Sequence, residues 1–119
     1  MRRSAERDAA GLTGVERTRL KLDLERERAV AVGEVRSEEA KARAAEPTPE
    51  PMDAAELARE QGDGALFLSR ARDHLREIDV ALAKIGEGTY GLSEKTGHPI
   101  GFPRLQAVPW ARFAADEEQ

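Results

Sequence analysis

The sequence of 119 residues contains no cysteine, which excludes a disulfide framework and any metal site built on thiolates. Histidine is almost as scarce: His74 and His98 alone are too few for a site built mainly on imidazole. Hydrophobic residues make up 39% of the chain and aromatic residues 4%, which is little for a globular core. We therefore expect the core to be a narrow seam between helices.

Long apolar runs are missing as well. No window approaches the length and apolarity of a membrane-spanning helix. The first residues, MRRSAERDAAG, are not followed by the apolar stretch of a signal peptide. These two absences predict a soluble, cytoplasmic protein.

Charged residues are abundant, at 35% of the chain, and they are unevenly distributed. Residues 1–45 hold 11 basic and 9 acidic residues, residues 46–85 hold 5 and 9, and residues 86–119 hold 3 and 5. A non-specific nucleic-acid binder needs a basic face that displaces counterions from the phosphates. The acidic centre of this chain disfavours direct DNA binding.

The clearest periodic signal is an apolar stripe with spacings of 3, 4, 3, 4 and 3 residues, which is the seam of a helix that pairs with another helix. Its members are Leu68, Ala71, Leu75, Ile78, Leu82 and Ile85. Gly86 and Gly88 follow the stripe and are expected to end the helix. A weaker stripe lies upstream, within a segment of high helix propensity at residues 15–44; it consists of Leu20, Leu24, Ala31 and Val35.

Between the two stripes lies EPTPEPMDAAE, whose three prolines within five residues forbid a continuous helix. The two helices must therefore reverse direction. We predict a mainly α protein in which residues 15–85 form a long antiparallel helical hairpin within one monomer, with an acidic tip at residues 46–55. Residues 1–14 are expected to be a flexible N-terminal segment.

Asp53 stands at the predicted start of the second helix, and Glu56 follows three residues later, which is the pattern of a capping box. Asp53 could therefore serve only to cap the helix. An acidic loop at the end of a long rigid hairpin could also probe a deep cleft that contains a cation. The two interpretations are compatible and both stay open.

The order of these segments resembles the DksA/TraR family of bacterial RNA polymerase regulators. The resemblance rests on PEPMDAA at the tip, LAKIGEGTYG at the end of the second helix and EKTGHPIGFPRLQAVP after it. It covers residues 15–117 and is most specific over residues 81–109. It implies that residues 86–119 form a small zinc-finger-like module with a short β-hairpin and a short helix.

The family holds zinc with four cysteines, which fall in this sequence on Ser93, Thr96, Ala114 and Glu117. All four ligands are missing, so we expect a degenerate module without zinc. Its folding would then depend on apolar packing. The candidate residues are four aromatic residues and their aliphatic neighbours: Tyr90, Phe102, Trp110, Phe113, Leu92, Ile100, Leu105 and Val108. We expect Leu92 and Ile100 to lie in a short hairpin, and Pro109 to open a short helix.

The resemblance also implies a function. Family members insert the hairpin into the secondary channel of RNA polymerase, and the tip acts near the catalytic magnesium to modulate initiation. The tip residues that matter most fall on Asp53 and Ala55, with Glu50 as an earlier acidic residue. Best-known members also bind the alarmone ppGpp with polymerase. Arg70 matches one alarmone-contacting position, but another basic position falls on Glu77. The C-terminal helix would also stop early, at residue 119. Dependence on ppGpp therefore stays open.

No catalytic site is predicted. Ser93, His98 and Asp116 could be combined into a nucleophile triad only on paper, because nothing gives Ser93 an elbow or an oxyanion hole. Two functions are compatible with the sequence. One is a regulator that binds polymerase through its secondary channel, and the other is a coiled-coil antagonist that occupies the same site without regulatory effect.

Overall fold

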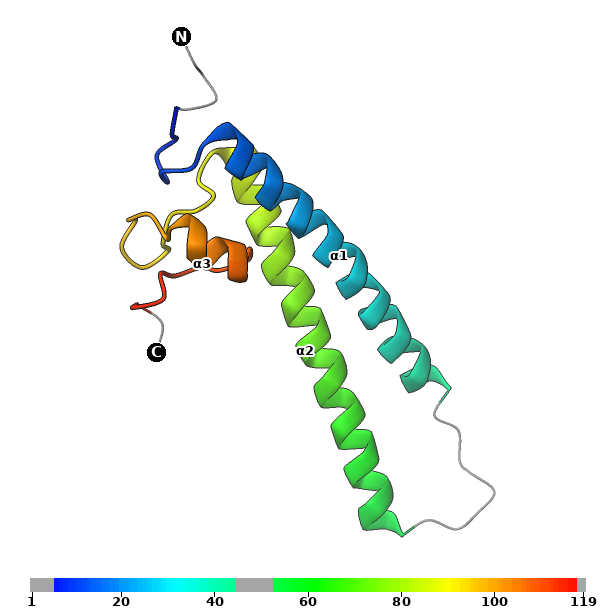
Figure 1. The fold of residues 1–119 in the computed structure, drawn as a ribbon. Coiled ribbons are helices and arrows are strands. Elements are labelled where there is room, and N and C mark those ends of the chain that lie inside the picture. Colours follow the sequence, from blue (N-terminus) through cyan, green and yellow to red (C-terminus); the bar gives the residue numbers. More distant parts are fainter. Residues whose placement is uncertain (1–5, 45–52, 118–119) are drawn as a thin grey trace. The chain divides into compact units, whose positions relative to one another are not determined.

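The computed structural model describes residues 6–44 and 53–117, and the described part is mainly helical. Its helices are α1 (Gly14–Arg43), α2 (Ala54–Glu87) and α3 (Phe102–Ala107) (Figure 1). The predicted fold class, a mainly α protein with a long helical hairpin and a small C-terminal module, is confirmed. Among the described residues, no helix is long and apolar enough to cross a bilayer.

The chain divides into two compact units. The first consists of Met1–Arg28 and Glu77–Gln119, and the second of Ala29–Arg76. Both α1 and α2 contribute residues to each unit, and each unit is described by itself below.

In the second unit, the C-terminal half of α1 packs against α2. Ala31 and Val35 of α1 are buried, as the weaker stripe predicted. An ion pair joins Arg72 of α2 to Glu39 of α1 at 3.0 Å. Every described residue from 53 to 67 is exposed, including Phe67. The first turns of α2 therefore bury no apolar side chain against the described part of the chain.

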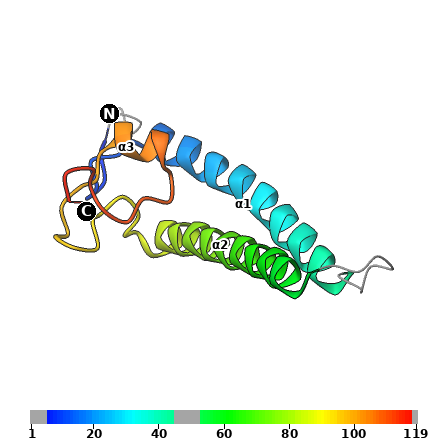
Figure 2. The ribbon, with the colours of Figure 1, turned by 90° about the horizontal axis from the view of Figure 1, so that it is seen from below.

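In the first unit, the beginning of α1 packs against the end of α2 (Figures 1 and 2). Leu20 and Leu24 of α1 and Ile78 of α2 are completely inaccessible to solvent. Arg28 of α1 donates a hydrogen bond to Asp79 of α2 at 2.6 Å. The seam positions that the spacing predicted thus supply the helix contacts of this unit.

Residues 6–13 differ from the expected flexible segment. Asp8 Oδ1 accepts hydrogen bonds from the backbone N–H groups of Ala10 and Leu12, both at 2.9 Å, which closes a tight turn. Ala10 and Leu12 are buried. A Cβ atom built on Gly91 would lie 2.8 Å from Ala10 Cβ and 3.2 Å from Leu12 Cδ1, so this turn packs directly on the C-terminal module. Burial of Leu12 explains why the segment is ordered.

The C-terminal module begins with the predicted short hairpin, reduced to a single antiparallel bridge between Leu92 and Pro99. The helix lies elsewhere than expected. It is α3, with Pro103 in its first turn, whereas residues 108–117 form turns. The carbonyls of Pro109 and Arg112 accept tertiary hydrogen bonds, from the Tyr90 hydroxyl at 2.8 Å and from the Glu94 N–H at 2.9 Å. Because a helix starting at Pro109 would need those carbonyls for its own ladder, these contacts replace it.

The core of the module is more aliphatic than we expected. Tyr90, Ile100 and Leu105 are buried, whereas the other three aromatic residues of the module are only half-buried. Burial raises the pKa of the Tyr90 hydroxyl, and the charge of Asp23 adds to the effect. The apolar core thus exists, but it centres on one tyrosine and on aliphatic residues.

Candidate functional site

The first candidate site is the acidic beginning of α2. Asp53 directly precedes α2, and its Oδ1 accepts a hydrogen bond from the backbone N–H of Ala55 at 3.0 Å. Its carbonyl accepts the first helical hydrogen bond, from the N–H of Leu57 at 2.9 Å. Asp53 therefore caps the helix, as its place in the sequence predicted. Its side chain is also exposed, so the same carboxylate is accessible to a partner.

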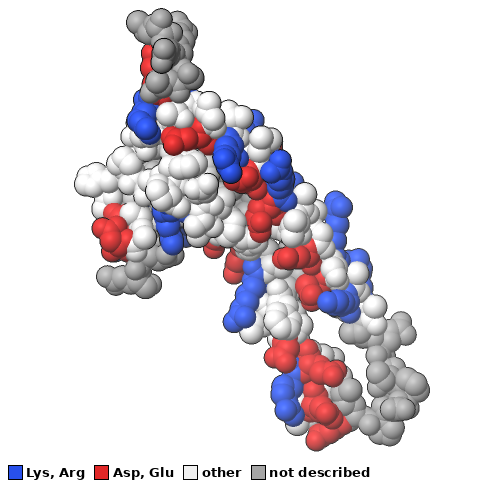
Figure 3. Space-filling model, viewed as in Figure 1, with Lys and Arg blue, Asp and Glu red and all other residues white. Residues whose placement is uncertain are grey.

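Acidic side chains gather on the surface of the first turns of α2 (Figure 3). Arg59 is the one basic residue among the described residues from 53 to 63. The acidic members of this surface are Asp53, Glu56, Glu60 and Asp63. Glu50, the third predicted tip residue, and most of the tip segment at 46–55 lie outside the described residues. The accessible part of the tip is thus a capped helix start with an acidic face.

Arg70 lies further along α2 with an exposed side chain. Its exposure leaves it accessible for the predicted alarmone or polymerase contact. Glu77, onto which the other basic position falls, is half-buried in the first unit. The pKa of the Arg112 guanidinium is raised mainly by the hydrogen bond and the charge of Glu94, and the charge of Glu77 makes the smallest contribution.

The second candidate site is the turn at residues 93–97, where the resemblance places two of the four zinc ligands. Ser93 is buried, and its Oγ accepts hydrogen bonds from the backbone N–H groups of Lys95 at 3.1 Å and Thr96 at 3.4 Å. The carbonyl of Ser93 accepts the N–H of Gly97 at 2.9 Å, which closes the turn. Gly97 has a φ of 77°, a left-handed conformation that glycine adopts without strain.

The remaining two positions lie against the same turn. Oε1 of Glu117 accepts a hydrogen bond from the backbone N–H of Ala114 at 2.9 Å. Hydrogen bonds from the Thr96 and Ser93 side chains, together with that of Ala114, hold the pKa of the Glu117 carboxyl below its usual value. Of the four positions that the resemblance aligned with zinc ligands, Ala114 and Glu117 are joined directly by a hydrogen bond.

These four residues do not fit a zinc ion. Two hydroxyls, one methyl group and one carboxylate cannot replace the thiolate or imidazole ligands that hold structural zinc. Among the described residues, no group of three or more metal-ligating side chains is close enough to hold an ion.

A third feature, which the sequence did not predict, is an ionic cluster around Glu94. Its carboxylate accepts hydrogen bonds from Lys84 at the end of α2, at 2.5 Å, and from Nε of Arg112 at 3.0 Å. The Arg112 and Lys84 hydrogen bonds lower the pKa of Glu94 to about 2. Because these residues are 10 and 18 positions away from Glu94, no local pattern could have indicated the cluster.

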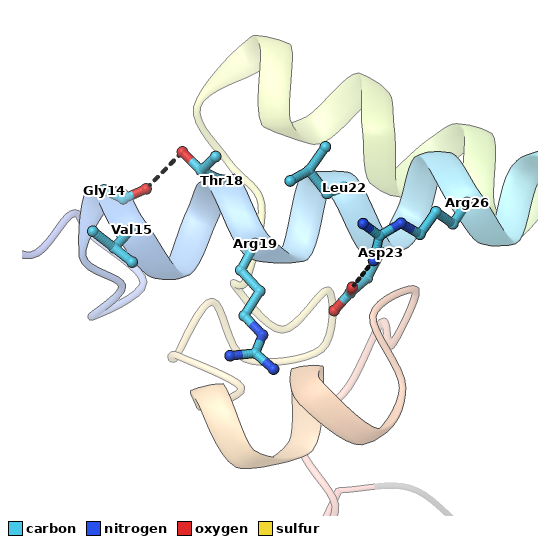
Figure 4. Close-up of a pocket in the computed structure, with 7 residues that line it drawn as sticks. All are labelled: Gly14, Val15, Thr18, Arg19, Leu22, Asp23 and Arg26. Carbon is cyan, nitrogen blue, oxygen red and sulfur yellow. Dashed lines mark hydrogen bonds and ion pairs between the residues drawn. The ribbon is translucent and has the colours of Figure 1, made fainter.

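A shallow hollow lies on the surface of α1 (Figure 4). Three of its polar side chains have partners within the helix: Thr18 donates to the carbonyl of Gly14 at 2.9 Å, and Arg26 lies 4.0 Å from Asp23. All lining residues belong to one helix: Gly14, Val15, Thr18, Arg19, Leu22, Asp23 and Arg26. The hollow contains no nucleophile with a general base, so it is not a candidate active site.

The Ser93, His98 and Asp116 combination is also unsuited to catalysis. Ser93 is buried, and its hydroxyl oxygen accepts hydrogen bonds from the backbone N–H groups of the turn. The contact between Ser93 and His98 is a backbone one, from the Ser93 N–H to the His98 carbonyl at 2.8 Å. A nucleophile needs a hydrogen bond from its side chain to a base, and this arrangement offers none among the described residues.

Comparison with known proteins gives both sequence and structural relatives, although no family model matches the chain. The RNA polymerase-binding transcription factor DksA of Caulobacter vibrioides is 41% identical over 71 residues, which is 56% of this chain and 49% of that protein. General stress protein 16O of Bacillus subtilis is 47% identical over 47 residues, which is 40% of this chain and 29% of that protein. The chain thus matches half or less of the length of these curated relatives.

The structural match is more extensive. The transcription factor DksA2 of Pseudomonas aeruginosa superposes with a TM-score of 0.79, covering 95% of this chain and 88% of that chain at 27% identity. The likeness therefore includes the helices and the C-terminal module, in agreement with the motifs found in the sequence. In sequence and in fold, the chain is thus similar to proteins named as DksA transcription factors, and it contains no cysteine.

Proposed function

We propose that this protein binds bacterial RNA polymerase through the secondary channel and modulates transcription initiation with the acidic beginning of α2. The observation that carries the proposal is the 41% identity to a protein named as an RNA polymerase-binding transcription factor. The match to DksA2 supports it, because the likeness extends over 95% of this chain.

The geometry of the tip supports an effector role. The exposed carboxylate of Asp53 is fixed in position by its hydrogen bond to Ala55, so little conformational entropy is lost when it meets a partner. Acidic residues continue along the same turns, with one arginine among them. Such a surface is suited to the neighbourhood of a bound cation or of basic residues in a deep channel.

The protein is proposed to act as a cytoplasmic, non-enzymatic regulator that binds polymerase as a monomer and does not contact DNA directly. Its C-terminal module is proposed to fold without zinc. Arg70 is exposed and could contact polymerase or ppGpp, and the response to ppGpp is a separate outcome of the experiment below.

The test has two steps. Purified protein should compete with an established secondary-channel factor for polymerase, and it should then change the lifetime of open complexes at a ribosomal RNA promoter. Binding together with an altered lifetime supports the regulator. Binding without any effect on the lifetime would identify the antagonist, and absence of competition would exclude both. Repeating the second step with ppGpp shows whether the alarmone contributes.

A further inference from the structure

One carboxylate joins three parts of the first unit: the turn at residues 93–97, the C-terminal turns at residues 108–117 and the end of α2. Both oxygens of Glu94 bind Arg112, since Oε1 accepts a hydrogen bond from Nη2 at 2.8 Å and Oε2 accepts one from Nε at 3.0 Å. Oε2 also accepts a hydrogen bond from Nζ of Lys84, in the last turn of α2, at 2.5 Å. The contacts span 18 and 10 positions of the chain, so they are tertiary rather than local.

The contact between Glu94 and Arg112 involves both side chains and backbone. The two parallel hydrogen bonds form the bidentate pair that suits a guanidinium and a carboxylate. The backbone N–H of Glu94 donates to the Arg112 carbonyl at 2.9 Å. The Arg112 guanidinium also lies over the ring of Phe113, 5.3 Å from its centroid, which favours this orientation. The same two residues therefore hold the two segments together at two levels.

Lys84 connects this pair to α2. Its carbonyl accepts the backbone N–H groups of Thr89 at 2.9 Å and Tyr90 at 3.2 Å, where the chain leaves the helix and enters the C-terminal module. The side chains of Lys84 and Glu94 are 20% and 29% exposed, so water and salt screen their contact less than that of a fully exposed pair. The cluster is thus a connected network of three charged groups, which contributes more than an isolated surface pair.

The segments that meet here are the ones that the resemblance expects a zinc ion to link. Glu94 lies inside the turn that holds the first two expected ligand positions, and Arg112 lies two residues before Ala114, the third. The residues at the ligand positions do not fit the ion. We propose that the ion pair between Glu94 and Arg112 links the two segments in place of a metal ion, and that Lys84 fastens this link to α2.

This inference goes beyond the proposed function and does not depend on it, because both experiments below are made without polymerase. The link acts in addition to the small apolar core of the module. Loss of the pair should therefore release the C-terminal turns from the turn at residues 93–97 before the core itself opens.

The first experiment measures amide hydrogen exchange by NMR in the full chain. In Arg112→Gln the side-chain link is lost, and the Glu94 amide, whose acceptor is the carbonyl of residue 112, should exchange about threefold faster or more. The matched control is Lys95→Gln. It removes one positive charge from the same turn, but the Lys95 side chain contacts the carbonyl of Glu117, at 3.4 Å. The Glu94 amide should keep its exchange rate in this control.

The Ile100 amide, which donates to the Gly91 carbonyl at 2.8 Å, separates a local opening from unfolding of the core. A larger acceleration at Glu94 than at Ile100 in Arg112→Gln, without acceleration in Lys95→Gln, supports the link. Unchanged exchange at Glu94 in Arg112→Gln, or an equal change in the control, would overturn the proposal. If Ile100 is accelerated to the same degree, the whole module has opened and the second experiment decides.

The second experiment is a double-mutant cycle of Glu94→Gln and Arg112→Gln, measured by chemical denaturation. Trp110 is the one tryptophan of the chain and lies two residues before Arg112, so its fluorescence reports unfolding of the module. Two side chains that act through each other give non-additive losses. The double variant should therefore lower the denaturation midpoint by about as much as Glu94→Gln alone, which already loses both partners of the carboxylate.

The matched control cycle combines Arg112→Gln with Glu87→Gln, which removes an exposed carboxylate at the end of α2. The losses of this control pair should add. Additive losses for Glu94→Gln and Arg112→Gln would overturn the proposal, because the two side chains would then act independently. Equal coupling in the two cycles would overturn it as well.

Discussion

The carboxylate of Asp53 accepts a hydrogen bond from the backbone N–H of Ala55 across 3.0 Å, so the two described residues of the predicted effector tip form one helix cap. The cap and the proposed effector role use the same carboxylate. A mutation that removes the side chain therefore changes both the local fold and the charge that would face polymerase. A pair of substitutions, one that keeps the cap and one that does not, separates the two effects.

Asp53→Asn keeps a good helix cap, since Asn and Asp rank alike at that position, but it removes the charge. Asp53→Ala removes both and should cost about 1 kcal/mol of local helix stability. If the charge acts in the channel, both variants should still bind polymerase, yet neither should alter the lifetime of the open complex. Normal activity of Asp53→Asn at equal polymerase occupancy would return Asp53 to a capping role alone.

Gly91 is predicted to be essential for docking of the N-terminal turn. Its φ is 89°, and an added Cβ would lie 2.8 Å from Ala10 Cβ, too close for two carbon atoms. Gly97 has a similar φ of 77° but nothing within 4 Å of an added Cβ. Both alanine variants carry backbone strain, and overpacking should make Gly91→Ala less stable than Gly97→Ala by about 1–3 kcal/mol. Chemical denaturation measures the difference, and equal losses would contradict the packing.

The ionic cluster around Glu94 predicts a definite dependence of stability on pH. Hydrogen bonds from Arg112 and Lys84 lower its pKa from 4.5 to about 2 in the folded state. A lowered folded-state pKa means that the unfolded chain binds the proton more readily, so stability is present above about pH 4.5 and is lost as the pH falls towards 2.

Glu94→Gln should remove this contribution and flatten the curve of unfolding free energy against pH in that window. Glu87→Gln is a suitable control, because Glu87 is an exposed glutamate at the end of α2. Parallel curves for Glu94→Gln and the parent would contradict the role of the cluster.

The exposed beginning of α2 contains two glycines, Gly62 and Gly64, that weaken the helix. Neither has a neighbour within 4 Å of an added Cβ, and neither has a positive φ. Replacing each by alanine should therefore stabilise the helix by roughly 0.5–1 kcal/mol. Circular dichroism should show more helix or a later loss of helix on heating. A decrease in either would mean that the glycines serve a conformation other than the helix.

Local patterns in the sequence were sufficient for the long helices. The spacing of apolar residues placed Leu20, Leu24 and Ile78 in the core, and all three are fully buried. The capping role of Asp53 followed from its place before the helix. These features depend on residues within a few positions of one another, where helix geometry makes the pattern visible.

The C-terminal module could be predicted only in part, because its contacts join residues far apart in the chain. The hairpin at Leu92 and Pro99 was expected, but the helix was placed after Pro109 when it lies at Phe102–Ala107. Helix propensity favours a helix that begins near Pro103 as much as one that begins at Pro109. The choice depended on tertiary hydrogen bonds to the carbonyls of residues 109 and 112.

The sequence by itself determined the helical hairpin, the capped acidic start of α2 and the absence of thiolate ligands, because each follows from residue type and short spacing. Only the tertiary structure decided that residues 6–13 pack on the module and that Glu94 joins Lys84 to Arg112. Hydrogen bonds and close packing between distant residues depend on where the chain returns in space, and no periodicity along the sequence records that.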